Sequence, residues 1–131
     1  MRLLLDTHII LWRLTASPRL PKRAVQIMDE GAVSIDVSAV SIWEVAVKWA
    51  LRKGRAGDMP MSGGDFLRAI ERAMIEPMPI QPIHAAAVDG LPPHHGDPFD
   101  RFLLATAVQE GMTFLTHDAT LAGYGDFVLV V

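Results

Sequence analysis

The sequence predicts an α/β fold, with a mostly parallel central sheet of about four to five strands and helices on both of its faces. The first observation is that three leucines, Leu3–Leu5, run without alternation into Asp6. An apolar run of this kind is typical of a strand that is buried on both faces, as in a covered parallel sheet. The second observation is that short apolar segments alternate along the chain with segments of helical periodicity. That order is typical of strand–helix–strand units.

Length and composition place the chain among globular proteins. Its 131 residues suit a single domain with a real core, which we expect to span residues 1–131. Half of the residues are hydrophobic and 21% are charged, which excludes a disordered chain. The absence of cysteine excludes disulfides and thiolate metal sites. No apolar run reaches the roughly 18 residues of a membrane helix, and no signal peptide is evident, so we expect a cytoplasmic protein without membrane contact.

The first half of the chain contains clear start and stop signals. We expect a strand over residues 1–5, a helix over 9–14, a helix over 22–30 that Pro21 opens and Gly31 ends, and a strand over 33–38. Ser41 is expected to be the N-cap of a helix over 42–53, with Glu44 in the capping-box position. That helix is apolar nearly all round. We therefore expect it to lie deep in the domain or against another chain.

The second half begins with a Gly/Pro-rich loop over 54–64 and a helix over 65–75. Residues 78–80 are predicted to form an edge strand, because prolines are tolerated at sheet edges. A short helix over 83–88 and a turn-rich loop over 90–98 follow. A helix over 100–110 then ends at the C-cap Gly111. Strands over 113–116 and 127–131 complete the predicted sheet.

Acidic residues stand where predicted strands end and helices begin. Asp6 follows the first strand, Glu44 opens the helix after the second, Asp97 and Asp100 open a later helix, and Asp118 follows the strand over 113–116. In a parallel sheet these points share one edge, where ligands of α/β proteins bind. We therefore expect the carboxylates to converge.

Each acid also has a purely structural interpretation. Asp97, followed by proline, suits an N-cap, and Asp118 could cap a turn at 119–121. Glu44 could pair with Lys48 at i, i+4 or complete the capping box.

Taken together, the acids require a cation. Two carboxylates about 4 Å apart repel by roughly 4 kcal/mol at an effective dielectric near 20. Carboxylate, hydroxyl and water oxygens suit Mg²⁺ or Mn²⁺, and such a site activates water for phosphoryl chemistry. No nucleophilic side chain is needed.

Four short motifs carry a resemblance to a known family. They are LLLDTH at 3–8, SAVSIWEV at 38–45, HGDPFDR at 95–101 and LTHD at 115–118. Together they resemble the PIN domain, specifically the VapC-like ribonuclease toxins of bacterial toxin–antitoxin systems. The resemblance implies a PIN-like three-layer sandwich. It also implies a Mg²⁺- or Mn²⁺-dependent endoribonuclease that cuts a structured RNA, such as tRNA or rRNA, with a metal-activated water. The implied partner is a VapB-like antitoxin.

The resemblance also implies roles for particular residues. Asp6, Glu44, Asp100 and Asp118 are expected to be the catalytic acids and metal ligands, with Thr116 as a hydroxyl neighbour and Asp97 as an accessory acid. His8 stands where many relatives have Asn or Cys, and we assign it no role. Asp36 lies outside the motifs and is left out of the site.

The histidines suggest a second kind of metal centre. His94 and His95 lie beside Asp97, and together with His8 and His117 they are compatible with a zinc or iron site. Adjacent histidines point apart on an extended chain, however, and no H-x-x-x-H pair occurs. Packing in the loop is the favoured interpretation, with His95 ordering the chain before Asp97.

Basic residues fall in two groups, although the formal net charge of −3 is not the usual footprint of a nucleic-acid binder. The groups are Arg13, Arg19, Lys22 and Arg23, and Lys48, Arg52, Lys53 and Arg55. If they flank the acidic edge they would hold RNA phosphates; otherwise they are solvated helix surface. No aromatic ladder is visible, which favours an RNA recognised by shape. Trp43 and Trp49 suggest a homodimer and a groove for an antitoxin segment.

Other functions remain as alternatives. A dehalogenase-type phosphatase needs a second Asp two residues after the first, where this chain has His8. A dinucleotide enzyme needs G-x-G-x-x-G, which is absent. A non-catalytic PIN-like interaction module would be expected to lack one of the four acids, and all four are present.

Overall fold

In the computed structural model, which describes residues 1–94 and 96–131, the sheet has four strands. They are β1 (Arg2–Leu5), β2 (Ser34–Asp36), β3 (Thr113–Thr116) and β4 (Val128–Val130). The spatial order is β2-β1-β3-β4, and every pairing is parallel. Leu4 of β1 lies opposite Phe114 of β3, so the two central strands end side by side at one edge. The predicted parallel sheet is confirmed.

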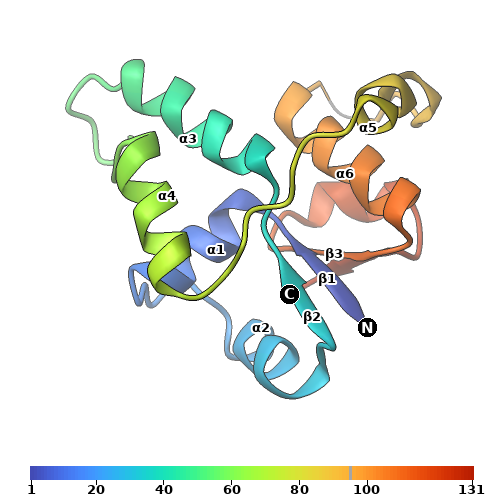
Figure 1. Cartoon of the computed structure of the whole chain (residues 1–131), viewed down its shortest axis with the longest axis horizontal. Coiled ribbons are helices and arrows are strands. Elements are labelled where there is room, and N and C mark those ends of the chain that lie inside the picture. Colours follow the sequence, from blue (N-terminus) through green and yellow to red (C-terminus); the bar gives the residue numbers. More distant parts are fainter. Residues whose placement is uncertain (95) are drawn as a thin grey trace.

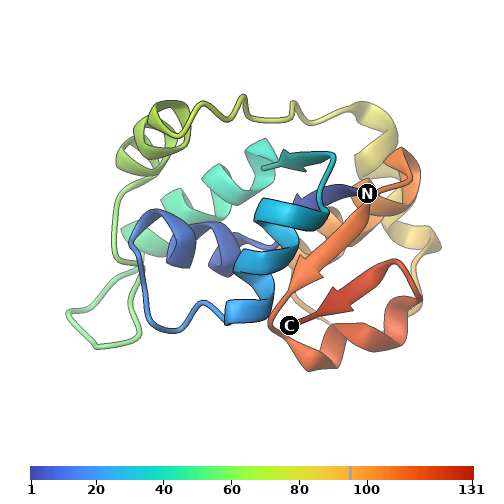
Figure 2. The same ribbon diagram turned by 90° about the horizontal axis from the view of Figure 1, so that it is seen from below.

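Helices cover both faces of the sheet (Figures 1 and 2). One face carries α1 (Thr7–Leu14), α2 (Lys22–Gln26), α3 (Ala39–Ala50) and α4 (Gly63–Arg72). The other face carries α5 (Pro82–Ala86) and α6 (Pro98–Glu110). Three short helical turns complete the elements: η1 (Ile27–Gly31, π-helical), η2 (Ala87–Gly90) and η3 (Ala119–Tyr124). None of the described helices is both long enough and apolar enough to cross a membrane.

The sheet lies between two hydrophobic clusters because side chains alternate along each strand. Leu3 and Leu5 pack into the cluster with Ile9 and Phe66, on the α1–α4 side. Leu4 packs into the opposite cluster with Leu103 of α6. All three leucines are fully buried. This is the three-layer arrangement that the unalternating leucine run predicted.

The predicted N-cap of α3 is wrong. The helix begins at Ala39, and Ser38 is its N-cap: the Ser38 hydroxyl accepts the Val40 N–H at 3.0 Å. Ser41 is instead buried inside the first turn, so it forms no capping box with Glu44. The reason is a tertiary contact. The Ala39 N–H donates to the Met78 carbonyl oxygen, which fixes the chain where it leaves β2.

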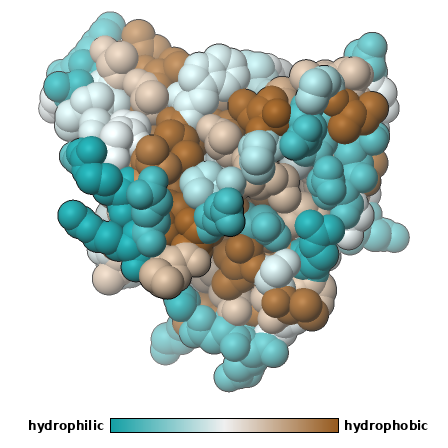
Figure 3. All heavy atoms as spheres, viewed as in Figure 1, coloured by the Kyte–Doolittle hydropathy of each residue, from teal (hydrophilic) through white to brown (hydrophobic). Residues whose placement is uncertain are grey.

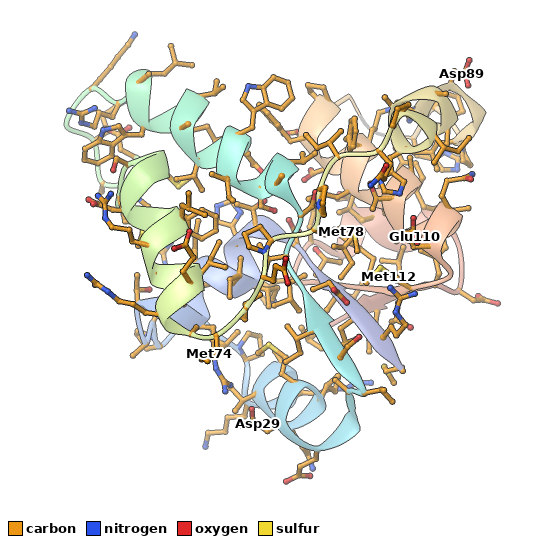
Figure 4. The ribbon with its side chains drawn as sticks, in the orientation of Figure 1. Asp29, Met74, Met78, Asp89, Glu110 and Met112 are labelled. Atoms are coloured by element: carbon orange, nitrogen blue, oxygen red, sulfur yellow. The ribbon has the colours of Figure 1, made fainter. Side chains whose placement is uncertain are left out.

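The predicted edge strand at 78–80 is reduced to one bridge between Ser38 and Met78. The Met78 N–H donates to the Val37 carbonyl oxygen at 2.8 Å, where the connecting segment passes the end of β2 (Figure 4). Pro77 and Pro79 flank Met78 and have no N–H to donate. The pairing therefore cannot extend beyond Met78.

Several element ends differ from the prediction. The helix predicted at 65–75 begins at Gly63, with Ser62 as its N-cap. The helix predicted over 22–30 becomes π-helical from Ile27. Gly111 is the C-cap of α6 in the left-handed conformation, as predicted. On the outer face, α5 is joined to α6 by His84 and Glu110, whose Nε2 and Oε1 atoms lie 2.7 Å apart; Figure 4 labels Glu110.

The apolar helix α3 is not enclosed by its own chain. Trp43 is 53% exposed and Leu51 is 67% exposed. Its inner side carries the fully buried Val40 and Val45. Of the two predicted positions for this helix, deep burial in the domain is therefore wrong for its outer side.

Gly111→Ala is expected to lower the free energy of unfolding by about 1–2 kcal/mol, because Gly111 has φ +64° and L residues are strained there. No heavy atom lies within 4 Å of the point that the alanine methyl group would occupy, so the cost isolates backbone strain. Gly31→Ala is the matched control, since its Cβ would also meet open space and its φ is ordinary. Urea unfolding measures both variants. Equal stability of the two would contradict the interpretation.

Candidate active site

Asp6 lies at the carboxyl end of β1 and is 7% exposed. Its backbone N–H donates to the Leu115 carbonyl oxygen at 2.9 Å, and its Oδ2 accepts the Thr116 hydroxyl at 2.7 Å. Burial raises the pKa of Asp6. The Thr116 hydrogen bond and the nearby His8 oppose that rise, and the Glu44 carboxylate adds to it. Asp6 is thus a carboxylate held away from water within electrostatic reach of a second acid.

Glu44, on the inner side of α3, is 2% exposed. Its Oε1 accepts the Thr7 hydroxyl at 2.6 Å, and its Oε2 is bound by the Lys48 ammonium. The Thr7 oxygen also lies 2.9 Å from the Ser41 hydroxyl oxygen. The Thr7 hydroxyl has one proton, so it donates a hydrogen bond to Glu44 and accepts one from the Ser41 hydroxyl. The predicted i, i+4 pair of Glu44 with Lys48 is confirmed.

Lys48 places a positive charge near the acids of α3 and of the start of α6. Burial lowers the pKa of Lys48, but the hydrogen bond and charge of Glu44, together with the charges of Asp97 and Asp100, outweigh it and raise the pKa overall. Acids from α3 and from the start of α6 are therefore within electrostatic reach of the same ammonium group. The Lys48 side chain keeps 37% of its surface exposed, so it can also meet a ligand.

Asp97 is the N-cap of α6, as its position before proline predicted. Its Oδ1 accepts the N–H groups of Phe99 and Asp100 at 2.8 and 3.1 Å. This turn presents Asp100 in the first turn of α6, toward Lys48. The other candidate cation, Arg101, donates to the Val88 and Pro92 carbonyl oxygens, which holds the preceding loop.

Asp118 follows β3 and caps η3, also as predicted. Its Oδ1 accepts the Thr120 N–H at 3.0 Å and the Thr120 hydroxyl at 2.6 Å. The Asp118 N–H donates to the Thr116 hydroxyl oxygen, whose own proton goes to Asp6. Thr116 thus ties the ends of β1 and β3 together. Asp6 and Asp118 line one cavity of about 280 Å³.

The predicted acids share one edge, yet their carboxylates are not gathered around one point. Among the residues that the structure describes, no group of three His, Cys, Asp or Glu side chains is arranged to hold a metal ion. Of the histidine pair, His94 packs edge-on against Tyr124 with ring centroids 5.5 Å apart. His95 lies outside the described residues, so its expected role in the loop stays a prediction.

Sequence reasoning missed the roles of three side chains around these acids. Thr7, whose only signal is a hydroxyl directly after Asp6, orients Glu44. Trp12 and His117 line the cavity that holds Asp6 and Asp118, together with Arg19, which belongs to the first of the two basic groups named from the sequence. No local signal identifies Trp12 and His117 as neighbours, because they reach the cavity from separate parts of the chain.

Only some residues of the two basic groups lie near the acidic edge. Arg19 and Lys48 each line a hollow that also includes His8. Arg13 instead pairs with Asp29, and Arg52 stacks on Trp49 at 3.7 Å from the ring centroid.

Asp6→Asn is expected to stabilise the protein at neutral pH. Because the pKa of Asp6 is raised in the folded state, the native protein binds more protons than the unfolded chain just above the ordinary value of 3.8. Stability is therefore lost as pH rises through the folded pKa, and the asparagine variant lacks this loss. Thermal unfolding from acid to neutral pH should show an advantage at pH 7 that vanishes at low pH.

Asp58→Asn is the control, for which the opposite change in stability is expected at pH 7. Backbone N–H groups of Arg55 and Lys53 lower the pKa of Asp58, so its charge stabilises the fold at neutral pH. This variant should lose stability at pH 7 and match the wild type in acid. An Asp6→Asn protein that is no more stable than the wild type at pH 7 would contradict the electrostatic account.

Lys48→Met is expected to lower the free energy of unfolding by about 1–3 kcal/mol, because the buried Glu44 carboxylate loses its counter-charge. Methionine keeps the apolar stem, and the partial exposure of Lys48 limits the loss. Arg68→Met removes a surface-exposed pair with Asp65 and should cost less than about 0.5 kcal/mol. Urea unfolding compares the two variants. Similar costs would show that the Glu44–Lys48 pair is no more than a surface contact.

The fold has relatives among solved structures. VapBC2 from Rickettsia felis, solved bound to a DNA fragment from its promoter, superposes with a TM-score of 0.66 at 11% identity, covering 100% of this chain and 98% of that chain. FitAcB from Neisseria gonorrhoeae gives a TM-score of 0.66 at 19% identity, covering 98% and 96%. These identities show a shared fold, and they confirm the predicted PIN-like sandwich.

Sequence comparison identifies the family. Ribonuclease VapC22 from Mycobacterium tuberculosis is 30% identical over 122 residues, which cover 92% of this chain and 90% of the relative. The PIN domain family model matches residues 3–126. The resemblance carried by the four motifs is therefore confirmed across almost the whole chain: it belongs to the PIN domain family and is similar to the VapC proteins within it.

Proposed function

We propose that this protein is a Mg²⁺- or Mn²⁺-dependent endoribonuclease and the toxin of a type II toxin–antitoxin module. The observation that carries the proposal is that acids from four separate segments share the carboxyl edge of the sheet, two of them buried: Asp6, Glu44, Asp100 and Asp118. The similarity to VapC22, a protein named a ribonuclease, supports the same activity.

The donor set suits a hard divalent cation. Asp6, Glu44, Asp100 and Asp118 would hold it, and all offer only oxygen, which Mg²⁺ and Mn²⁺ prefer. Burial is the main cause of the raised pKa of Asp6, and Glu44 is paired with a lysine. A nearby positive charge would therefore stabilise the ionised form of both carboxylates. When bound, such an ion would generate hydroxide from water and stabilise charge on a phosphate.

The side chains around the acids prepare them for this role. Thr116 occupies one oxygen of Asp6, and Thr7 occupies one oxygen of Glu44, so each carboxylate has a fixed orientation. Asp97 acts as an accessory acid by setting the first turn of α6. The partly exposed Lys48 ammonium can donate to a phosphate oxygen of RNA at the edge. The reaction needs no nucleophilic side chain.

The proposed substrate is a structured RNA such as tRNA or rRNA. Arg19 lies at the cavity of Asp6 and Asp118, and Lys48 lines a neighbouring hollow of about 390 Å³ beside the loop that holds Asp58. These cations would bind phosphates on either side of the cleavage point. Phosphate contacts position an RNA and carry no sequence information, so they support recognition by shape.

The proposed partners are a VapB-like antitoxin and a second copy of the chain. A groove of about 480 Å³ between α3 and α4 is lined mostly by apolar side chains, among them Ile42, Trp43, Trp49 and Leu67. In Figure 3 hydrophobic side chains form several separate patches on this face, one of them a band that borders α4. An amphipathic antitoxin segment would cover such a groove. Four solved structures of similar fold are named for VapBC or FitAB-type systems, which supports this choice.

Cleavage of total RNA by the purified protein should require Mg²⁺ or Mn²⁺ and stop in EDTA. Asp6→Asn, Glu44→Gln, Asp100→Asn and Asp118→Asn should each reduce the rate by at least ~100-fold, because even outer-shell partners of a metal site typically contribute 10–100-fold. Gel analysis of labelled RNA ends measures the rate. Asp36→Asn is the matched control, an acid on β2 outside the site, and should cut at the wild-type rate.

Isothermal titration with Mn²⁺ separates this function from a non-catalytic interaction module. The wild type should bind the metal, and Asp6→Asn should bind it more weakly. A folded Asp6→Asn protein that cuts RNA at full rate with Mg²⁺ would refute the assignment.

A further inference from the structure

Three aromatic rings form a cluster beside the acidic edge. Trp12 lies in the middle, with ring centroids 5.8 Å from His8 and 5.5 Å from His117. His8 and Trp12 are one turn apart on α1, and His117 follows β3. The cluster exists because β1 and β3 are neighbours and both end at this edge. His117 is further fixed by its Nδ1, which lies 2.5 Å from the Val131 carbonyl oxygen.

These rings share a cavity with two of the proposed catalytic acids. The cavity of about 280 Å³ is lined by Asp6, His8, Trp12, Arg19, His117 and Asp118. Its size is slightly below the roughly 300–1,000 Å³ of small-molecule pockets, so it has room for no more than about one nucleotide unit. It therefore combines carboxylates, one guanidinium group and three ring systems in a space for a single nucleotide.

Core packing does not account for the cluster. Trp12 packs partly against the α1–α4 hydrophobic cluster, but His8 and His117 are exposed. Neither histidine takes part in orienting Asp6, Glu44 or Asp118 through a hydrogen bond among the interactions described. Exposed rings held at a cavity mouth are typical of surfaces on which nucleobases stack.

We propose that His8, Trp12 and His117, together with Arg19, form a subsite for one unstacked nucleobase of the RNA next to the phosphate that is cut. The proposal rests on the proposed function. The rings stack on the base, and the Arg19 guanidinium neutralises an adjoining phosphate. Stacking accepts every base, because each has a π-face, so the subsite positions the strand and does not read its sequence. It requires a single-stranded loop or bulge in an otherwise structured RNA.

The test compares hexaadenylate with its fully abasic counterpart, which keeps every phosphate and loses every base. Binding is measured by fluorescence anisotropy in EDTA at fixed salt, where no cleavage occurs. The wild type should bind hexaadenylate roughly tenfold more tightly than the abasic strand, since one stacked base commonly contributes at least that much. In Trp12→Leu this ratio should fall to about one, with abasic binding unchanged.

Two further variants complete the test. Val33→Ala removes an exposed apolar side chain that lines none of the cavities described and should keep the wild-type ratio. His117→Ala changes an exposed side chain, is not expected to affect folding, and should reduce the ratio severalfold even if Trp12→Leu fails to fold. A wild-type ratio near one, or a ratio that survives in a folded Trp12→Leu protein and in His117→Ala, would overturn the subsite. Because no metal or cleavage enters this measurement, that result leaves the nuclease assignment standing, and absent cleavage leaves the subsite standing.

Discussion

Two carboxylates removed from water, Asp6 and Glu44, impose the conditions that the rest of the site meets. Each is buried, and each is within electrostatic reach of the other. Buried charges persist only when they are paired or hydrogen-bonded. The Thr116 hydroxyl, on the neighbouring strand, donates a hydrogen bond to Asp6. The Thr7 hydroxyl, at the start of α1, donates one to Glu44. Lys48 contributes the countercharge from the same helix as Glu44.

The acids at this edge differ in what they contribute to the local structure. Asp97 and Asp118 use one oxygen each to cap a helix or turn, so they help to build the edge on which they lie. The Asp6 side chain makes no capping hydrogen bond at the start of α1, and it accepts the Thr116 hydroxyl. A carboxylate that is costly to bury and contributes little to local structure is best explained by ligand binding.

The sequence predicted those features that local chemistry decides. The unalternating leucines implied a covered parallel sheet, and the Asp97–Pro98 pair and Gly111 marked both ends of α6. The start of α3 was wrong because Ser38 and Ser41 are equally good caps locally. The choice between them depends on Met78, which is distant in sequence. The acidic edge was predicted as a set of neighbours, but separations between side chains follow from packing that no motif encodes.

The aromatic cluster shows the same limit more sharply. His8 and Trp12 could be recognised as neighbours on a helix, but neither signals a stacking surface by itself. His117 joins them only because β1 and β3 pair in parallel. A search along the sequence for regularly spaced aromatic residues therefore fails. The folded chain nevertheless brings the three rings together from two turns at adjacent strand ends.

Helix α3 carries the buried Glu44 and the exposed Trp43 at consecutive positions. One face of a twelve-residue helix thus belongs to the acidic edge and the adjoining face to the groove shared with α4. Gly63 of α4 packs so closely on Ala46 that a Cβ there would lie 2.8 Å from the alanine methyl carbon, which fixes how the two helices meet. In evolutionary terms, few positions of this helix can be substituted without affecting one of its two faces. Under the proposed function, a lineage that acquires a new antitoxin must remodel the outer face one side chain at a time, while the inner face keeps its geometry.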